Sequence, residues 1–258
     1  MAESDANPNR LRMPNLRKFF RPDPGMMLGD ADLSGADAQV VAWEAEDEDL
    51  KSAFRAGIKI HAHNAKKMFG DKAGPDGKKM PFYQDCKQGC HAVNYGAGPA
   101  KLAATVGYTK QFWTNFRAQW FALHPGIHRW HKRVETGLYS TRTISNRFGY
   151  RIVYFDRLEG LLPEALAWIA QGSVAITCIK GSLRLRAVPK VQILMQIHDS
   201  LIFQYPLTEH PHILPAIHKA LHIPIPYDDP LIIPWGLKLS DRSWGDARTA
   251  AWETGIIT

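Results

Sequence analysis

Residues 191–205 restrict the fold more than any other segment, because they read as an apolar run VQILMQI, a polar tip HDS and a second apolar run LIFQY. Two short apolar runs rich in β-branched and aromatic residues around a polar turn are typical of a β-hairpin. An isolated hairpin is only marginally stable in water, so these strands require further strands or helices to cover them. Asp199 lies at the tip, where its carboxylate would project from a rigid hairpin.

The rest of the chain alternates predicted helices with a few predicted strands. A short strand is expected at residues 30–33, followed by a helix that Ser34 caps. The other expected elements are helices at 48–69 with a break at Gly57, at 82–95, from Ala100, at 109–138 with a break at 124–126, at 163–186 and at 211–222, a hairpin at 143–155, a loop at 71–81 and a final strand at 230–239. This mixed order predicts an α+β fold rather than a doubly wound parallel sheet.

Charge and composition indicate the class of partner. The chain of 258 residues has a net charge of +7, and its basic residues are spread along the sequence rather than gathered in one tail. A dispersed pattern suits phosphate contacts over a folded surface and favours a polyanionic partner. No apolar run approaches membrane-spanning length and the N-terminus lacks an apolar secretory segment, so no membrane partner is expected. With 3 cysteines, reduced thiols in a cytoplasmic protein are expected.

Two aspartates stand at rigid positions suited to metal chemistry. Asp32 lies where a strand passes into a helix, and Asp199 lies at the hairpin tip. Carboxylates on adjacent strands can hold two Mg²⁺ about 3.5–4 Å apart, as phosphoryl transfer from a nucleoside triphosphate requires. The alternative is that Asp32 caps a helix and Asp199 is a turn residue. Asp30 competes with Asp32, since residues two apart share a strand face.

Four residues spaced by four define one face of the helix at 82–95: Tyr83, Lys87, His91 and Tyr95. Such a face can present an ammonium group, an imidazole and two aromatic rings to a triphosphate and its sugar. The alternative is an amphipathic helix with a polar outer stripe. Gly89 argues against a helix built for stability, because glycine costs up to about 1 kcal/mol relative to alanine.

Together these segments resemble family A DNA polymerases, the class of bacterial DNA polymerase I and of many phage replicases. Residues 30–37, DADLSGAD, resemble the family's first metal motif, and Lys87, His91 and Tyr95-Gly96 resemble its nucleotide-binding helix. The segments AQGS at 170–173, QIHDSL at 196–201 and DRSWG at 241–245 resemble the family's later motifs in the same order. Ordered occurrence over roughly residues 14–245 makes the resemblance specific, and the wording HAVNYGAGPAKLA is similar to phage members.

The resemblance implies a role for each matching residue. Asp32 and Asp199 would be metal ligands, with the Leu33 carbonyl as a further ligand. Lys87 would neutralise the triphosphate and protonate pyrophosphate, His91 would pack on the incoming sugar, and Tyr95 would lie at the base of the insertion site. Asp37 stands where relatives use Glu to exclude a ribose 2′-hydroxyl. The minor groove near the primer end would be contacted by Gln171, Gln196 and His198.

Three positions depart from the family pattern. Tyr83 stands in place of an arginine, so one phosphate cation is expected from Lys78 or Lys79. Asp37 is one methylene shorter than Glu. Ser200 replaces a carboxylate of the HDE trio.

The implied architecture is an antiparallel-sheet palm subdomain with a helical fingers insertion, the thumb and exonuclease being absent. Residues 1–60 are expected to form the first part of the palm, 61–142 the fingers and 143–258 the second part of the palm. We therefore expect a split DNA-directed DNA polymerase that binds primer-template DNA, dNTPs and a separate thumb and exonuclease polypeptide. It would act in a bacterial cytoplasm if phage-encoded. The alternative is a catalytically inactive subunit that binds primer-template or assists assembly.

The remaining basic and histidine clusters have competing interpretations. Arg142, Arg147 and Arg151 either hold template phosphates or form a solvated basic face. Histidines near residues 61–63, 124–131 and 210–212 are expected to be packing or surface residues, because no closed four-ligand zinc set is apparent.

Overall fold

The computed structural model describes residues 14–74 and 82–258, and the chain forms two compact units. The first comprises Asp32 with the described residues before it, Gly181–His222 and Trp235–Thr258. The second comprises Leu33–Lys180 and Ile223–Pro234. These boundaries differ from the expected subdomain boundaries after residues 60 and 142, and the assignment of palm and fingers stays a prediction.

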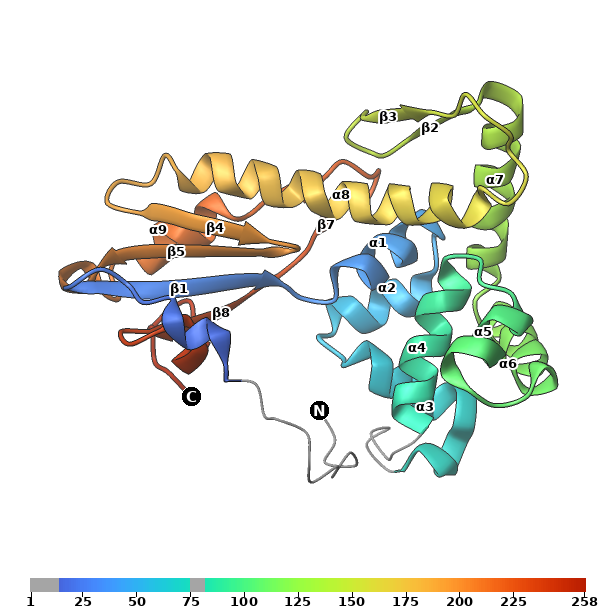
Figure 1. The fold of residues 1–258 in the computed structure, drawn as a ribbon, viewed down its shortest axis with the longest axis horizontal. Coiled ribbons are helices and arrows are strands. Elements are labelled where there is room, and N and C mark those ends of the chain that lie inside the picture. Colours follow the sequence, from blue (N-terminus) through green and yellow to red (C-terminus); the bar gives the residue numbers. More distant parts are fainter. Residues whose placement is uncertain (1–13, 75–81) are drawn as a thin grey trace. The chain divides into compact units, whose positions relative to one another are not determined.

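The first unit is built on an antiparallel sheet with strand order β4-β5-β1-β8-β9 (Figure 1). Its strands are β1 (Met26–Leu33), β4 (Gln192–Ile197), β5 (Ser200–Pro206), β8 (Trp235–Ser240) and β9 (Arg248–Ala250). Strands β4 and β5 form the predicted hairpin, in which Ile197 pairs with Ser200. The mixed α+β class is confirmed.

Apolar side chains cover both faces of this sheet. On one face Leu28, Ile202 and Trp244 form a buried cluster, with Trp244 supplied by the 3-10 helix η4 (Trp244–Asp246). Elsewhere in the unit Gly181, in the last turns of α8 (Leu162–Leu185), comes so close to Leu201 and to other apolar side chains that an added Cβ would lie within 3.6 Å of them. The same unit contains η1 (Leu16–Phe19), η3 (Leu207–Glu209) and α9 (Leu214–Ala220).

The second unit is mainly helical and agrees closely with the expected pattern. Its elements are α1 (Ala36–Glu44), α2 (Glu48–Arg55), α3 (Ile60–Phe69), η2 (Gly70–Ala73), α4 (Phe82–Asn94), α5 (Pro99–Val106), α6 (Lys110–Leu123), α7 (Pro125–Thr141), β2 (Thr143–Ser145), β3 (Arg151–Val153), most of α8, β6 (Pro224–Ile225) and β7 (Leu231–Ile232). The expected breaks at Gly57 and at 124–126 are confirmed, as is the hairpin at 143–155.

Two local predictions were wrong. Gly35, not Ser34, is the N-cap of α1, because the chain enters this helix in the left-handed region with φ 59° and makes no side-chain cap bond. The single strand expected at 230–239 divides into β7 and β8 around Pro234, which has no N–H to donate to a ladder. The loop expected at 71–81 lies partly outside the described residues.

Helix α8 has the length expected from the sequence, and it is strongly apolar. By length and composition alone its 24 residues could cross a membrane. A buried core helix of a soluble protein passes the same test, and Ala165, Leu166 and Ala170 of α8 are fully buried. Packing therefore accounts for the buried face of α8, while Ile179 and Leu183 of the same helix are exposed.

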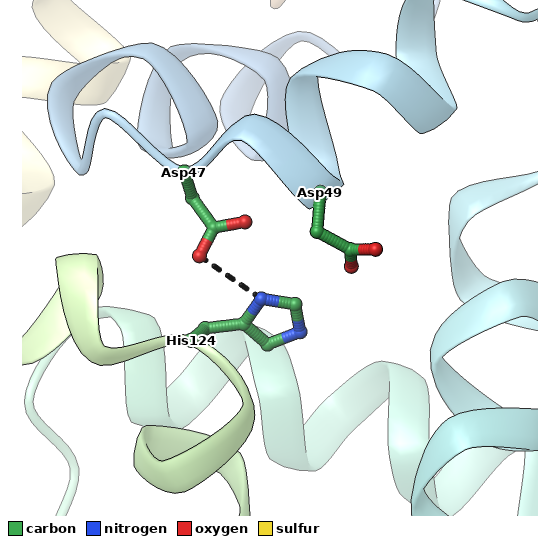
Figure 2. Close-up of side chains that lie close together, drawn as sticks. All are labelled: Asp47, Asp49 and His124. Carbon is green, nitrogen blue, oxygen red and sulfur yellow. Dashed lines mark hydrogen bonds and ion pairs between the residues drawn. The ribbon is translucent and has the colours of Figure 1, made fainter.

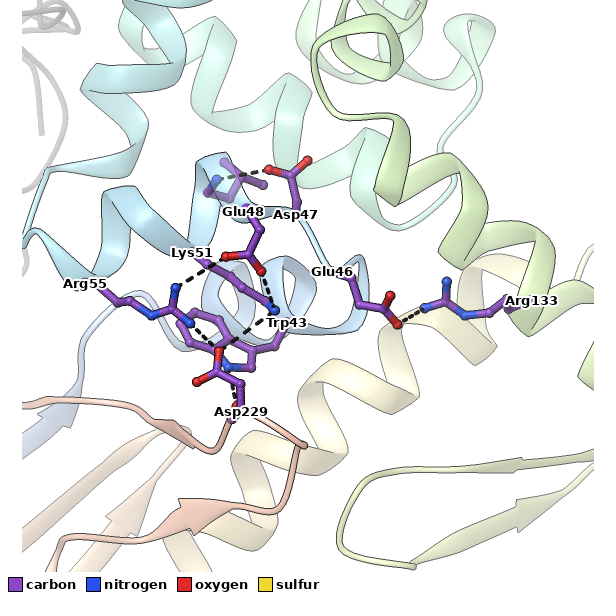
Figure 3. A network of polar contacts seen from close by, with 9 residues as sticks. Trp43, Glu46, Asp47, Glu48, Lys51, Arg55, Arg133 and Asp229 are labelled. Atoms are coloured by element: carbon purple, nitrogen blue, oxygen red, sulfur yellow. Dashed lines mark hydrogen bonds and ion pairs between the residues drawn. The ribbon is translucent and has the colours of Figure 1, made fainter.

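Asp229 fastens the short segment 223–234 to helices α1 and α2 (Figure 3). Its backbone carbonyl accepts the indole N–H of Trp43 at 2.8 Å, and its carboxylate is paired with Arg55. Lys51 and Arg55 also share Glu48, and both cations lie over the Trp43 ring. Ion pairs and the buried Trp43 ring therefore hold the segment 223–234, which has little regular structure.

The turn between α1 and α2 packs tightly against the start of α7. Gly126 lies against the carbonyl of Ala45, so closely that an added Cβ would collide with it. Asp47 caps α2 by accepting the Leu50 N–H at 3.0 Å, and its other carboxylate oxygen lies 3.1 Å from Nδ1 of His124 (Figure 2). Burial raises the pKa of Asp47, but these two hydrogen bonds outweigh it and hold the pKa below its ordinary value.

Gly126→Ala is expected to lower the free energy of unfolding by about 1–3 kcal/mol, because a backbone carbonyl must move to admit the methyl group. Gly137→Ala in the same helix is the matched control, since nothing lies within 4 Å of its added Cβ. The control should be neutral or stabilising by up to about 1 kcal/mol. Urea unfolding of both variants measures the difference, and equal effects would contradict the close approach of Gly126 to Ala45.

Asp47→Ala is expected to destabilise the chain by about 1–3 kcal/mol at neutral pH, because it removes a helix cap and leaves a buried histidine unpaired. Since the folded pKa of Asp47 is depressed, the unfolded chain binds the proton more readily. The contribution is therefore present above the ordinary aspartate value of about 4 and is lost as the pH falls through the lower folded value.

The measurement is denaturant unfolding of wild type and variant between pH 7 and pH 3. Asp49→Ala, at an exposed neighbour paired with Lys67, should cost less than about 1 kcal/mol. A wild-type advantage over Asp47→Ala that stays constant down to pH 3 would show that this carboxylate is not the source.

Candidate active site

The register of β1 with β5 places Asp32 beside the hairpin tip. Asp32 is the Cα partner of Ser200, and Asp199 immediately precedes Ser200. The two carboxylates are close enough to interact directly: burial first, and then the charges of Asp199 and Asp30, raise the pKa of Asp32, while Lys238 lowers it. The structure thus brings the two predicted metal ligands together within one unit.

The hairpin tip has a tight geometry that fixes Asp199. His198 has a positive φ of 54°, which is uncommon for a residue with a side chain. Its Nδ1 lies 3.0 Å from Oδ1 of Asp199, and its carbonyl accepts the amide of Gln196 at 3.5 Å. The side chain of His198 is 75% exposed and that of Asp199 only 29%, so the imidazole is the more accessible group.

The donor set at this tip suits a hard divalent cation. Two like charges held close together are stabilised when a cation enters between them. Mg²⁺ prefers carboxylate, carbonyl and water oxygens. Asp32 and Asp199 are the groups of this unit that would hold it, and the Leu33 carbonyl stays a predicted ligand.

A different group of potential ligands lies in the second unit. Asp47, Asp49 and His124 offer ligand atoms within 4.8 Å of one another (Figure 2). The carboxylates already have protein partners: Asp47 caps α2 and contacts His124, and Asp49 is paired with Lys67 and with His63 at 3.6 Å. These contacts account for the carboxylates as part of a structural network, whereas Nε2 of His124 is buried without a hydrogen-bond partner.

In the second unit α4 gathers the predicted nucleotide-binding side chains. His91 and Tyr95 meet edge to face with ring centroids 4.9 Å apart. His61 of α3 joins them: burial, and then the charges of Lys87 and His91, lower the pKa of His61 to about 4. Lys87 is exposed. A cation, two imidazoles and a phenol therefore share one face.

Asp37, at the start of α1, lies beside this face of α4. Burial, and then the nearby Asp37 carboxylate, raise the pKa of Tyr95 far above its ordinary value, so the phenol stays neutral. Asp37, His61, His91 and Tyr95 line one small pocket. The predicted sugar-discriminating residue and the predicted insertion-site tyrosine thus lie at the same pocket.

The side of α4 that packs against the protein interior carries Gly89, Cys86 and Cys90. A Cβ at Gly89 would lie 2.6 Å from the Trp113 ring and 2.8 Å from the Phe116 ring, so α6 requires glycine there. Cys86 and Cys90 are buried with their sulfur atoms 3.5 Å apart. Both observations place the packing side of the helix away from Lys87 and His91.

The predicted DNA-contacting residues differ in how available they are. Gln171 on α8, Gln196 and His198 are exposed. Arg147 is already engaged, because its Nε lies 3.3 Å from Glu44 and its guanidinium lies over the Tyr227 ring. The candidate phosphate cations Lys78 and Lys79 lie outside the described residues.

Two residues at these sites were missed by sequence reasoning. His61 was treated as a packing histidine, and the sequence HAH alone does not reveal its proximity to α4. Asp30 was set aside in favour of Asp32, yet it is buried and bonded to Ser200. The alternation of Asp30 with Asp32 was the available signal for it.

Comparison with known proteins agrees with this geometry. The model of DNA polymerase family A matches residues 7–237. DNA polymerase I of Helicobacter pylori is 27% identical over 206 residues, covering 76% of this chain and 22% of that protein. The thermostable DNA polymerase I of Thermus filiformis is 27% identical over 267 residues, covering 95% of this chain and 31% of that protein.

The polymerase domain of Pol1 from M. smegmatis, solved with DNA primer-template and dNTP, superposes with a TM-score of 0.79 at 21% identity. It covers 92% of this chain and 44% of that chain, which confirms the fold. The chain spans about a quarter to a third of the length of the curated relatives it matches. Because the family model covers most of its length, the chain belongs to DNA polymerase family A.

Proposed function

We propose that this chain carries the nucleotidyl-transfer centre of a DNA-directed DNA polymerase, which adds a dNTP to a primer 3′ end on a DNA template. The observation that carries the proposal is the proximity of Asp32, near the end of β1, to Asp199, which precedes its strand partner Ser200. Family membership and the described relatives support it.

Each described group has a step in this reaction. Two magnesium ions, when bound, would activate the 3′-hydroxyl and neutralise the departing pyrophosphate. Asp32 and Asp199 would hold these metal ions at the end of two inner strands of a rigid sheet. Lys87 binds the triphosphate and donates a proton to the pyrophosphate oxygen. His91 and Tyr95 orient the nucleotide, and Asp37 restricts the sugar.

The separate thumb and exonuclease polypeptide expected from the sequence is likewise a proposal. The edge strand β4 leaves Leu194 and Ile197 exposed, at 40% and 38%, which supplies the apolar surface such a contact needs. Co-purification of this chain with neighbouring gene products would identify the partner. Processive extension of long primers by this chain alone would contradict it.

Asp32→Asn and Asp199→Asn are each expected to reduce primer extension on the order of 10³-fold or more, because metal ions supply several kcal/mol of transition-state stabilisation. The assay is extension of a labelled primer with Mg²⁺ and dNTPs, with and without co-expressed partners. Asp156→Asn, at an exposed bend, is the matched control and should extend normally.

Primer-template binding is measured in parallel by fluorescence anisotropy. Normal binding without extension under any partner condition would favour the inactive-subunit alternative over catalysis.

Asp37→Ala is expected to raise use of ribonucleotides relative to deoxyribonucleotides by about tenfold or more, since loss of one steric or polar contact is worth about 1–3 kcal/mol. The ratio of kcat/KM values for the two nucleotides measures it. Asp37→Glu retains the carboxylate and should preserve discrimination. An unchanged ratio for Asp37→Ala would remove Asp37 from sugar selection.

A further inference from the structure

Asp30 is a buried carboxylate whose two oxygens each accept a side-chain hydrogen bond. It is 4% exposed. Its Oδ1 accepts the hydroxyl of Ser200 at 2.5 Å, and its Oδ2 accepts the indole N–H of Trp244 at 2.8 Å. A carboxylate held by two donors in an apolar cluster is fixed in position and orientation.

Asp30 shares a sheet face with the proposed metal site. Residues two apart on a strand point to the same face, and directly paired residues of neighbouring strands do so as well. Asp30, Asp32 and Ser200 therefore lie on one face, since Asp32 is the Cα partner of Ser200. Ser200 is also the residue that follows Asp199 in the chain. A single hydroxyl thus links Asp30 to the backbone that carries Asp199.

Structure alone gives little reason for a carboxylate at this position. Leu28 and Ile202 surround it with apolar surface, and Trp244 completes the cluster. Removing a charge from water costs several kcal/mol, and well-packed apolar replacements of buried polar networks are often neutral or stabilising. Retaining Asp30 under these conditions points to a use of its charge.

The substitution pattern of the hairpin points to the same use. Ser200 stands where the family resemblance leads one to expect a carboxylate. The structure provides a carboxylate from the neighbouring strand within hydrogen-bond reach of that serine. In this chain a carboxylate on β1 thus lies beside the position on β5 where the resemblance implies one.

We propose that Asp30 is a positioning residue that acts through Ser200 and replaces the carboxylate expected at position 200. It fixes the hairpin that presents Asp199, and it adds a third negative charge beside the proposed metal ligands Asp32 and Asp199. This inference rests on the proposed function. The proposal gives Asp30 no role as a ligand, because it is 4% exposed and each of its oxygens accepts a hydrogen bond that holds it in place.

The test measures binding of Mn²⁺ alone to the full chain by electron paramagnetic resonance, with no nucleotide or DNA. The Asp32→Asn, Asp199→Asn double variant supplies the baseline for binding elsewhere. Asp30→Asn is expected to weaken the remaining binding about 10-fold or more, as outer-shell partners of metal ligands typically do. Trp244→Phe removes the other hydrogen bond but keeps the ring, and should change Mn²⁺ affinity less than about threefold.

The deciding variant relocates the charge. Asp30→Ser combined with Ser200→Asp returns a carboxylate to position 200 and a hydroxyl to position 30. It should bind Mn²⁺ within about threefold of wild type, whereas Ser200→Ala alone should weaken binding about 10-fold. A merely structural role would lower the unfolding midpoint of Asp30→Asn without changing Mn²⁺ affinity, and relocation would not restore binding.

Three results would overturn the inference: unchanged Mn²⁺ affinity in Asp30→Asn and Ser200→Ala, no rescue on relocation, or wild-type binding no greater than the baseline. If Asp30→Asn fails to fold, Ser200→Ala and the relocated pair decide alone. Primer extension is scored separately. A wild-type chain that extends no primer under any partner condition but shows these Mn²⁺ effects would refute the proposed function and leave the role of Asp30 intact.

Discussion

The antiparallel pairing of β1 with β5 is the constraint on which the proposed catalytic centre depends. Met26 pairs with Pro206 at one end of the ladder and Asp32 with Ser200 at the other, so the register is continuous over seven pairs. A slip of β1 by one residue would turn Asp30 and Asp32 to the face opposite Ser200. The apolar cluster of Leu28, Ile202 and Trp244 opposes such a slip, because burial of that face fixes which residues point toward it. Packing at one end of the strand pair therefore sets the chemistry at the other.

Most of the elements could be predicted because their signals are local. The hairpin at 191–205 has its turn and both strands within fifteen residues, and the helix breaks at Gly57 and His124 follow from glycine and proline nearby. The two predictions that were wrong also have local causes. Pro234 divides the last predicted strand, and Gly35 takes a left-handed conformation that makes it the cap in place of Ser34. Both depend on how the chain turns between elements, which periodicity does not report.

The site was predictable only in part, because its long-range contacts leave little trace in the sequence. The choice of Asp32 over Asp30 came from the family resemblance, whereas the structure distinguishes them by Trp244, 214 residues away, which bonds to Asp30. Gly89 counted against a functional helix until the rings of Trp113 and Phe116 explained it. Arg147 was expected to bind template phosphates, but its partner Glu44 lies 103 residues away and could not be inferred from its neighbours.

Asp30 and Asp32 lie on one strand face but have different environments, and this difference indicates a different role for each. Asp30 is buried, and each of its oxygens accepts a hydrogen bond from a fixed donor, so the charge of this carboxylate already has polar partners. Asp32 instead has carboxylates as its nearest charged influences, and only Lys238 opposes them. Like charges held this close are costly until a cation neutralises them. The sheet therefore fixes one carboxylate firmly and leaves the other in need of a counter-charge, and this is the property that a metal-binding edge requires.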